Sequence, residues 1–489
     1  MNVIFVSSEV VPFAKTGGLA DVAGALPAAI SALGHNTCVF MPLYRHVMEK
    51  GLPMEETGVK VEFPVWHRKQ KASVFKGTLP GTDVTVYFIE HDDYYYRRDL
   101  YSHAGEGYHD NSERFAFFSR AVLEAVDALG IEPDVFHLND WQSALISVYL
   151  KTEYAAHESL GKAATLLTIH NLAYQGSFPK WHMNFTGISW DHFNWKEMEF
   201  YGSVNFLKGG IVFADILNTV SQKYAKEIQT EEFGAGLEAV LSSRSDDLFG
   251  ILNGVDYASW NPATDNLIPA NYSPGDLKGK ALCKRDLQKH YALPQKPAVP
   301  LIGIVSRLAD QKGFDILGEA IEDIMKLDLQ LVVLGTGTQK YHELFKKIAD
   351  KYPNKAGVSL KYDNKLAHMI EAGSDMFLMP SRYEPCGLNQ MYSLKYGTLP
   401  IVRATGGLAD TITDFNPDTL KSGEANGFSF DDYDTDTLFE TVKRAVDTYA
   451  KKPKDWKKLV STAMSQDFSW EVSAKEYVKL YEKAAAKHG

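Results

Sequence analysis

The chain has 489 residues, several times the ~100–200 residues of a typical domain, so two or more domains are expected. Its composition is ordinary, with 45% hydrophobic and 23% charged residues, which excludes a disordered, collagen-like or coiled-coil chain. A net charge of −11 gives the surface no general attraction for phosphate backbones or anionic lipid. Nucleic-acid binding and membrane-surface binding are therefore not expected.

The cysteines and the amino terminus bear on the compartment. Cys38, Cys283 and Cys386 lie far apart and form no C-x-x-C pair, so neither a zinc site nor a disulfide framework is predicted. The apolar start lacks a basic region and reaches Glu9 too soon for a signal peptide. No stretch approaches the ~18 consecutive apolar residues of a membrane helix. We expect a cytoplasmic protein.

Short β-rich apolar runs bounded by turns recur along the chain in two series. The first half contains Val3–Ser7, Cys38–Met41, Val135–Leu138, Leu166–Ile169 and Ile216–Val220. The second half contains Leu301–Val305, Leu329–Leu334, Met376–Met379, Leu399–Val402 and Gly427–Phe430, with helical patterns at Phe314–Leu327 and Gln339–Lys351. Continuous apolar runs that alternate with helices predict parallel strands buried on both faces. The fold class is therefore α/β, with two Rossmann-like, doubly wound lobes.

A boundary between the lobes is predicted at Gly250–Pro269, where a strand runs into Asn-Gly-Val-Asp and a proline-containing stretch. The lobes then cover residues 1–250 and 251–470, and residues 471–489 form an amphipathic helix expected to pack back on the first lobe. The hexapeptide Thr-Gly-Gly-Leu-Ala-Asp occurs at Thr16–Asp21 and again at Thr405–Asp410, each time before a predicted helix. This repeat favours related halves, although convergence on the same turn is an alternative.

A lysine loop, Lys15-Thr-Gly17-Gly18-Leu, follows the first predicted strand and opens a helix. Two glycines let a ligand approach the backbone closely, and helix-terminal N–H groups beside a lysine form an anion site. The alternative is an ordinary glycine turn with an exposed lysine. The chain contains neither a P-loop nor a G-x-G-x-x-G fingerprint, which disfavours a dinucleotide oxidoreductase.

A second cationic pair, Arg307 and Lys312, lies just beyond the strand Leu301–Val305. Open α/β sheets bind ligands outside the carboxyl ends of their strands, so these side chains are placed to hold a diphosphate. The alternative is a surface arginine and lysine beside a helix start.

Polar residues lie at the ends of two predicted strands of the first lobe. They belong to His137-Leu-Asn139-Asp140-Trp and Thr-Ile-His170-Asn171, and they would hydrogen-bond the hydroxyl groups of a ligand. The alternative is that these are structural residues at strand ends.

In the second lobe, Ser-Arg-Tyr-Glu384-Pro-Cys386-Gly387-Leu388-Asn389 follows a strand and opens a helix. One interpretation is that the carboxylate of Glu384 only interacts favourably with the helix dipole. The other is that it binds sugar hydroxyls, while the N–H groups of Gly387 to Asn389 face a phosphate.

An acidic stretch, Asp431–Asp436, has D-x-D spacing, which would suit a metal. Thr437 stands where an EF-hand needs glycine and Lys443 where it needs glutamate, so the EF-hand pattern fails. Helix capping explains the acidic residues better, and no metal site is predicted.

Together these motifs resemble the bacterial and plant glycogen (starch) synthases of the ADP-glucose type, glycosyltransferase family 5. The resemblance runs from Val3 to about Trp470 and rests on four motifs. They are K-T-G-G-L at Lys15–Leu19, H-N at His170–Asn171, N-G-V-D at Asn253–Asp256 and E-P-C-G-L at Glu384–Leu388.

The family implies a GT-B fold, two lobes facing a deep cleft. It also implies transfer of glucose from ADP-glucose to the non-reducing end of an α-1,4-glucan, with retention of configuration and without a metal or cofactor.

The resemblance also implies roles for individual residues. Those matching catalytic positions are Lys15, His170, Arg307, Lys312 and Glu384. Those matching the nucleotide-sugar site are Lys15, Gly17, Gly18, Asp140, Asn171, Arg307, Lys312, Tyr362, Cys386, Gly387, Leu388 and Asn389. Tyr95 matches a cleft tyrosine near the sugar. Asn139 and Asn389 depart from the histidine and threonine of many bacterial members, which weakens the assignment of roles at those two positions.

Three alternatives stay open at this point. One is a UDP-glucose-using synthase and another is a glucan phosphorylase, which would need a pyridoxal-phosphate lysine and a longer chain. The third is a glucan-binding protein without catalysis, which the intact set of cations and Glu384 disfavours. The expected partners are ADP-glucose and an α-1,4-glucan such as glycogen or starch.

Overall fold

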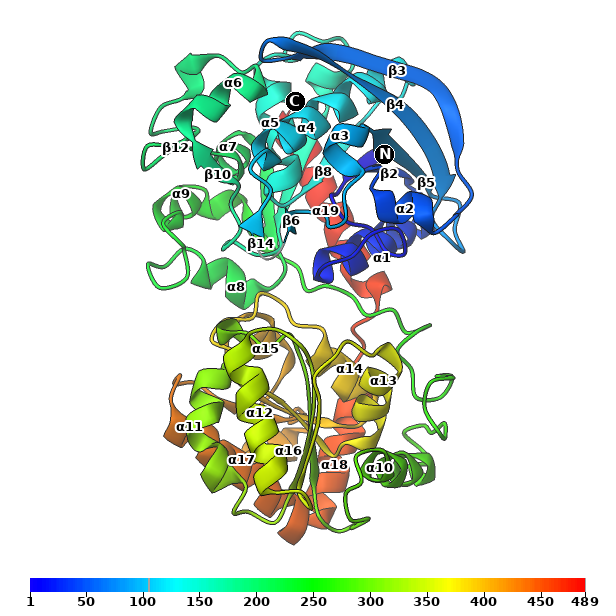
Figure 1. The fold of residues 1–489 in the computed structure, drawn as a ribbon, viewed down its shortest axis with the longest axis vertical. Coiled ribbons are helices and arrows are strands. Elements are labelled where there is room, and N and C mark those ends of the chain that lie inside the picture. Colours follow the sequence, from blue (N-terminus) through cyan, green and yellow to red (C-terminus); the bar gives the residue numbers. More distant parts are fainter. Residues whose placement is uncertain (104–105, 489) are drawn as a thin grey trace. The chain divides into compact units, whose positions relative to one another are not determined.

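The structure is a computed structural model that describes residues 1–103 and 106–488 (Figure 1). The chain divides into two compact units. Unit 1 comprises residues 1–220 and 225–254 together with the terminal segment from Trp470, and unit 2 comprises residues 221–224 and 255–469. Among the described residues, no helix has both the length and the apolar character needed to span a membrane.

Unit 1 contains a large sheet with the strand order β14-β13-β9-β8-β1-β2-β5-β4-β3. Its strands are β1 Asn2–Val6, β2 Asn36–Pro42, β3 Glu55–Val65, β4 Arg68–Thr78, β5 Thr85–Glu90, β8 Val135–Asn139, β9 Ala164–Ile169, β13 Ile216–Thr219 and β14 Leu248–Gly250. The strands from β14 to β5 run parallel to their neighbours, whereas β4 and β3 are antiparallel. Smaller strands are β6 Ser102–His103, β7 Glu106–Gly107, β10 Ser177–Pro179, β11 Glu199–Phe200 and β12 Ser203–Asn205.

Helices lie on both faces of this sheet. Unit 1 contains α1 Gly18–Ala32, α2 Arg45–Glu49, α3 Asp92–Tyr95, α4 Asn111–Ala128, α5 Trp141–Lys151, α6 Met183–Thr186, α7 Phe206–Phe213, α9 Glu238–Ser243 and α19 Trp470–His488, and α8 Gln222–Glu227 begins in the segment 221–224 that belongs to unit 2. On one face, His137 hydrogen-bonds both Thr168 of β9 and Tyr481 of α19. The neighbouring Leu167 packs instead beneath Gly210 of α7. Because successive strand residues point to opposite faces, α19 and α7 cover opposite sides.

Unit 2 contains a parallel sheet with the order β17-β16-β15-β18-β19-β20. Its strands are β15 Leu301–Val305, β16 Gln330–Leu334, β17 Ala356–Ser359, β18 Met376–Met379, β19 Leu399–Arg403 and β20 Phe428–Phe430. Its helices are α10 Lys278–His290, α11 Phe314–Ile324, α12 Gln339–Lys351, α13 Asn364–Gly373, α14 Asn389–Lys395, α15 Gly406–Thr411, α16 Pro417–Ser422, α17 Thr435–Lys451 and α18 Pro453–Ser465.

The core of unit 2 shows why its strands are apolar throughout. Leu331 and Val333 of β16 belong to one buried cluster, while the alternate residues Val332 and Leu334 belong to another. Both faces of the strand are therefore covered, as a doubly wound sheet requires. This arrangement confirms the predicted α/β class.

Both sheets share one topology. Numbered by order along the chain, the unit 2 strands run 3-2-1-4-5-6, and the parallel strands of unit 1 follow the same order from β5 to β13. The order reverses between β1 and β8 in unit 1 and between β15 and β18 in unit 2. In open α/β sheets this switch point is where ligands bind.

The repeated hexapeptide does not occupy equivalent places in the two units. The copy at Thr16–Asp21 follows β1, the first strand, whereas the copy at Thr405–Asp410 follows β19, the fifth strand of its sheet. In the second copy a Cβ on Gly406 would lie 2.0 Å from the Glu384 carbonyl oxygen. In the first copy a Cβ on Gly17 would meet no atom of the described residues within 4 Å. The repeat is thus a local coincidence and is not evidence for related halves.

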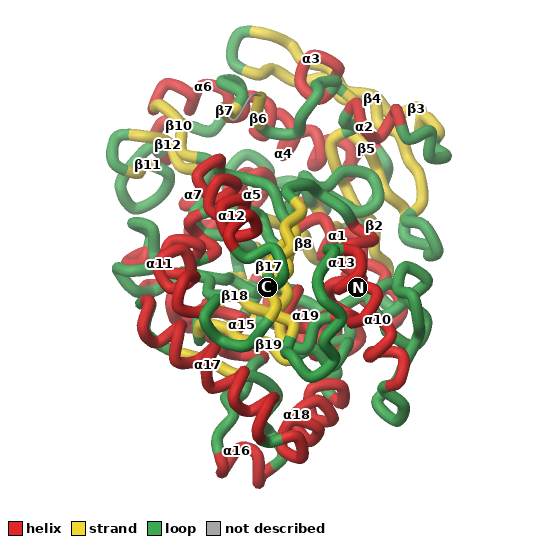
Figure 2. The backbone as a smooth tube through the Cα atoms, turned by 60° about the horizontal axis from the view of Figure 1, so that its bottom comes forward, coloured by secondary structure: helices red, strands yellow, loops and turns green. Residues whose placement is uncertain are grey.

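The long β3–β4 hairpin at the edge of the unit 1 sheet, drawn in yellow in Figure 2, is not predicted by the sequence analysis. Its first strand alternates exposed and buried residues, since only one face packs on the protein. Without a continuous apolar run, the strand carries no signal of the kind that marks β1 or β15.

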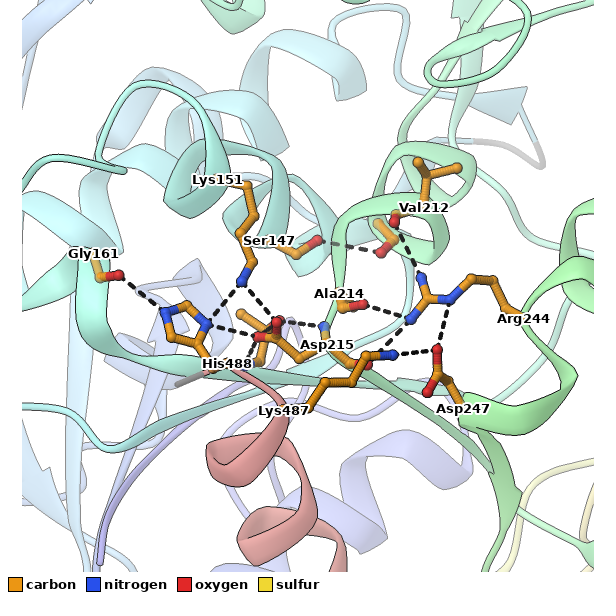
Figure 3. A network of polar contacts seen from close by, with 12 residues as sticks. Ser147, Lys151, Gly161, Val212, Ala214, Asp215, Arg244, Asp247, Lys487 and His488 are labelled. Carbon is orange, nitrogen blue, oxygen red and sulfur yellow. Dashed lines mark hydrogen bonds and ion pairs between the residues drawn. The ribbon is translucent and has the colours of Figure 1, made fainter.

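The terminal helix α19 packs against α1, β8 and β9 of unit 1 and ends in a polar network (Figure 3). His488 Nε2 lies 3.0 Å from the Gly161 carbonyl oxygen, and Nδ1 lies 2.8 Å from Lys151 Nζ. Lys151 Nζ is 2.7 Å from Asp215 Oδ1. Burial alone would raise the pKa of Asp215, but hydrogen bonds from Lys151 and the Thr165 backbone outweigh burial and lower it.

Asp215→Asn is expected to lower the free energy of unfolding of unit 1 by about 3 kcal/mol at pH 7, because it leaves Lys151 without its buried partner. A folded-state pKa below the unfolded value stabilises the protein above about pH 4, and that stabilisation disappears as the pH falls through the folded pKa. The difference in unfolding free energy between the wild type and Asp215→Asn, measured by urea titrations from pH 3 to 7, should therefore shrink at low pH. Asp246→Asn, at an exposed position of the same unit, serves as control. A difference independent of pH would contradict this role.

Candidate functional site

Two predicted ligand residues of unit 1 meet at the ends of adjacent strands. Strands β8 and β9 pair in parallel with Asn139 opposite Thr168, so Asp140 and His170 follow side by side. Asp140 Oδ1 accepts a hydrogen bond from the His170 backbone N–H at 2.7 Å. Burial raises the pKa of Asp140 to about 7, although hydrogen bonds from the backbones of His170 and Asn171 oppose the shift. Asp140 therefore titrates near neutral pH.

The imidazole of His170 is held from the β8 side. Its Nε2 lies 2.9 Å from Asn139 Oδ1. Burial lowers the pKa of His170 to about 3, so the ring is neutral at physiological pH. Asn171 Oδ1 accepts the Ala173 N–H at 3.1 Å, which forms a local turn after the strand.

The lysine loop is organised by Glu9, a residue that the sequence analysis did not propose for the site. Glu9 is 4% exposed. Its Oε1 accepts hydrogen bonds from the Thr16 hydroxyl at 2.6 Å and the Tyr101 hydroxyl at 2.8 Å. Its Oε2 accepts the N–H groups of Thr16 and Gly17. Two backbone donors of the predicted anion site are thus already bound by Glu9, and only donors from Gly18 onward stay available.

Lys15 and the glycines flank this carboxylate. Lys15 Nζ is paired with both carboxylate oxygens of Asp21, at 2.7 and 2.8 Å. Helix α1 begins at Gly18, and Gly17 caps it without a side chain. The sequence carries no specific signal for Glu9, because a single acid behind a strand matches no motif.

Glu9→Gln is expected to lower the free energy of unfolding by about 1–3 kcal/mol, because the amide offers one accepting oxygen where the carboxylate offers two. The amide NH₂ would then face the N–H donors of the loop. Chemical denaturation measures the change. Glu49→Gln, at an exposed position on α2, is the control and should have little effect. Equal effects of the two variants would contradict the role of Glu9 in this loop.

In unit 2 the structure brings together Lys312 and Glu384. Lys312 Nζ lies 2.6 Å from Glu384 Oε2, and the Ser381 hydroxyl donates to the same oxygen at 2.9 Å. Lys312 follows β15 and Glu384 follows β18, so the pair sits at the switch point of the sheet. Gly313 allows this approach, since its φ is +74° and a Cβ there would lie 1.8 Å from the Pro380 carbonyl oxygen. Glu384 is itself 6% exposed.

The remaining predicted residues of unit 2 differ in how they are held. Arg307 is exposed, and its Nη2 lies 3.3 Å from Gln311 Oε1. Asn389 Nδ2 donates to the Val305 carbonyl at 2.7 Å, which ties the start of α14 to the end of β15. Cys386 is buried, Gly387 has a φ of +70°, and Leu388 caps α14. Tyr362 is 81% exposed.

Tyr95 does not fit its predicted sugar contact. Its side chain is fully buried, and its hydroxyl donates to the Arg114 carbonyl at 2.9 Å. The sequence has three consecutive tyrosines here and does not show which ring faces outward. In the structure the short helix α3 places Tyr95 in the core, while Tyr96 is half-exposed. Tyr95 is therefore a packing residue in this structure.

The acidic stretch is a helix cap, as the sequence favours. Asp434 Oδ1 accepts the Thr437 N–H at 2.9 Å at the start of α17. Within residues 1–103 and 106–488, no group of three or more His, Cys, Asp or Glu side chains is placed to hold a metal ion.

Comparisons with known proteins show the family of the chain. Residues 2–243 match the family described as starch synthase catalytic domain, and residues 287–460 match glycosyl transferases group 1. Glycogen synthase 1 of Geobacter sulfurreducens is 49% identical over 488 residues, covering 100% of this chain and 97% of the relative. Glycogen synthase of Fervidobacterium nodosum is 48% identical over 491 residues, covering 100% and 99%.

Solved structures show the same likeness. The catalytic domain of starch synthase IV from Arabidopsis thaliana, bound to ADP and acarbose, is 34% identical with a TM-score of 0.90, covering 99% of each chain. Sucrose-phosphate synthase from Thermosynechococcus elongatus, 16% identical with a TM-score of 0.60, shares the fold. The resemblance predicted from the four motifs is confirmed, and the chain belongs to the glycogen synthase and starch synthase family of glycosyltransferases.

Proposed function

We propose that the protein is a glycogen synthase that transfers glucose from ADP-glucose to the non-reducing end of an α-1,4-glucan with retention of configuration. The observation that carries the proposal is the pairing of Lys312 with Glu384 at the switch point of the unit 2 sheet. Switch points bind ligands in open α/β sheets, and a cation beside a carboxylate suits a phosphate next to a sugar. The relatives from Geobacter sulfurreducens and Fervidobacterium nodosum are glycogen synthases, which supports the same activity.

In this proposal Arg307 and Lys312 bind the diphosphate of the donor. Breaking the bond between glucose and phosphate builds negative charge on the departing ADP. Cations fixed in advance stabilise that charge most where water is excluded. Gly387, Leu388 and Asn389 would offer N–H groups of the α14 start to the phosphate.

The same proposal gives each unit its own contacts with sugar. In unit 2, Glu384 would position hydroxyl groups of the transferred glucose. In unit 1, Asp140, His170 and Asn171 would hydrogen-bond sugar hydroxyl groups. Lys15 and the N–H groups from Gly18 onward would add a contact to the donor. Retention then follows from attack by the acceptor on the face that the leaving group vacates.

A radiolabel assay tests the function. With glycogen as acceptor, ADP-[¹⁴C]glucose is expected to label the polymer and release ADP, while UDP-[¹⁴C]glucose labels it far more slowly. The reaction should continue in EDTA, since side-chain cations would stabilise the leaving group. Preference for UDP-glucose would favour the alternative synthase, and loss of activity in EDTA restored by magnesium would contradict the metal-free mechanism. Glucan binding without glucose transfer would favour the alternative that the protein binds glucan but has no catalytic activity.

A further inference from the structure

The orientation of the Asn139 side chain is fixed by its surroundings. Asn139 is fully buried at the end of β8. Its Nδ2 donates to the carbonyl oxygen of Val6 at 3.0 Å and to that of His137 at 3.3 Å. A flipped amide would place Oδ1 against two carbonyl oxygens, which have no proton to donate. The amide nitrogen therefore faces the carbonyls, and Oδ1 faces His170.

This orientation determines where the proton of His170 lies. Asn139 Oδ1 is an acceptor, so His170 Nε2, 2.9 Å away, must carry the hydrogen. The low pKa of His170 keeps the ring neutral, so Nδ1 then holds a lone pair. Nδ1 makes no hydrogen bond to any residue in the described part of the chain. Two titratable groups interact with His170: Asp140, which accepts its backbone N–H, and the buried His137, whose pKa is lowered by burial and by His170.

We propose that Asn139 is a positioning residue that locks His170 in the Nε2–H tautomer, so that Nδ1 accepts a hydrogen bond from a hydroxyl group of the transferred sugar. The sugar contact of His170 rests on the proposed function, whereas the tautomer lock stands on the contacts of Asn139 alone. A histidine at this position would offer either a donor or an acceptor according to its own tautomer. Asparagine held by two carbonyls offers only the acceptor.

The lock is tested by ¹⁵N NMR of protein labelled only at its 15 histidines. The His170 signals are assigned by their loss in His170→Gln. In the wild type we expect a protonated Nε2 and a bare Nδ1 from pH 6 to 8. Asn139→Leu removes the acceptor and should give a mixture of tautomers. Asn139→Asp keeps an oxygen acceptor toward His170, while its second oxygen faces the carbonyls of Val6 and His137 and must carry a proton to pair with them, so the variant should keep the Nε2–H tautomer.

Thr168→Val is the matched control. The Thr168 hydroxyl lies 2.8 Å from Nε2 of His137, on the neighbouring strand of the same sheet. This variant should change the His137 signals and leave those of His170 unchanged. If Asn139→Leu unfolds, Asn139→Ala, which also removes the acceptor but adds no bulk, still tests the lock through the tautomer of His170.

Activity gives a second readout. Asn139→Leu is expected to lower kcat/KM for ADP-glucose about 10-fold, the effect of one misplaced hydrogen bond, without changing KM for glycogen. Asn139→His should recover part of the loss. A bare Nε2 in the wild type, or an unchanged single tautomer in Asn139→Leu, would overturn the proposal. If the protein transferred no glucose, the NMR result would still stand, so the two failures are distinguishable.

Discussion

Replacing Arg307 with alanine is expected to lower kcat by about 10²–10³-fold, the effect of losing one group that stabilises charge in the transition state. The loss should appear in kcat with ADP-glucose, because the charge develops only as ADP departs. Stability should not change, since Arg307 is exposed and, within the described part of the chain, its side chain hydrogen-bonds only Gln311, at 3.3 Å. Steady-state kinetics and thermal unfolding measure the two effects separately.

Arg285→Ala provides the control for Arg307, because Arg285 is an exposed arginine of the same unit on α10. Its removal should leave kcat near the wild-type value. If Arg307→Ala kept a normal kcat and only weakened binding of glycogen, Arg307 would belong to the acceptor site and not to the leaving-group site.

Replacing Lys312 with alanine should damage both activity and stability. We expect a loss of about 10²–10³-fold in kcat, as for Arg307. In addition the buried carboxylate of Glu384 would lose its partner at 2.6 Å, which typically costs about 3–5 kcal/mol in unfolding free energy. Lys312→Ala should lose stability, whereas Arg307→Ala should not, because the carboxylate that Lys312 contacts, Glu384, is 6% exposed and has little access to water.

The double variant Lys312→Ala/Glu384→Gln separates these two effects. A neutral amide in place of the carboxylate removes the unpaired buried charge, so the double variant should recover most of the stability lost in Lys312→Ala. It should recover none of the activity, since the cation is still absent. Recovery of activity would show that Lys312 acts only by holding Glu384. An unchanged stability of Lys312→Ala would show that the pair is not closed in solution.

Much of the architecture could be predicted because the parallel strands are buried on both faces. Strands such as β15 and β18 are continuous apolar runs bounded by polar turns, and their bounds agree with the predicted ones. The hairpin β3–β4 was missed because its residues alternate between solvent and core. Strand β17 was missed because four residues, two of them Gly357 and Ser359, give little apolar signal.

For the candidate site, the sequence identified the residues that follow strand ends. Parallel strands deliver their carboxyl ends to one edge, so Asp140 beside His170 and Lys312 beside Glu384 follow from strand order once the sheet is known. It did not reveal that Glu9 occupies backbone donors of the lysine loop. It also placed Tyr95 at the sugar, whereas α3 buries that ring.

The sequence by itself determined the fold class and the family, because both depend on local patterns: apolar runs of strand length, glycine turns and short motifs at strand ends. Only the tertiary structure decided the partners of individual polar groups. Asp215 and His488 are 273 residues apart in the chain, and Asn139 meets the Val6 carbonyl across 133 residues. A hydrogen bond needs atoms within about 3 Å and aligned, and such precision arises only when distant segments pack together.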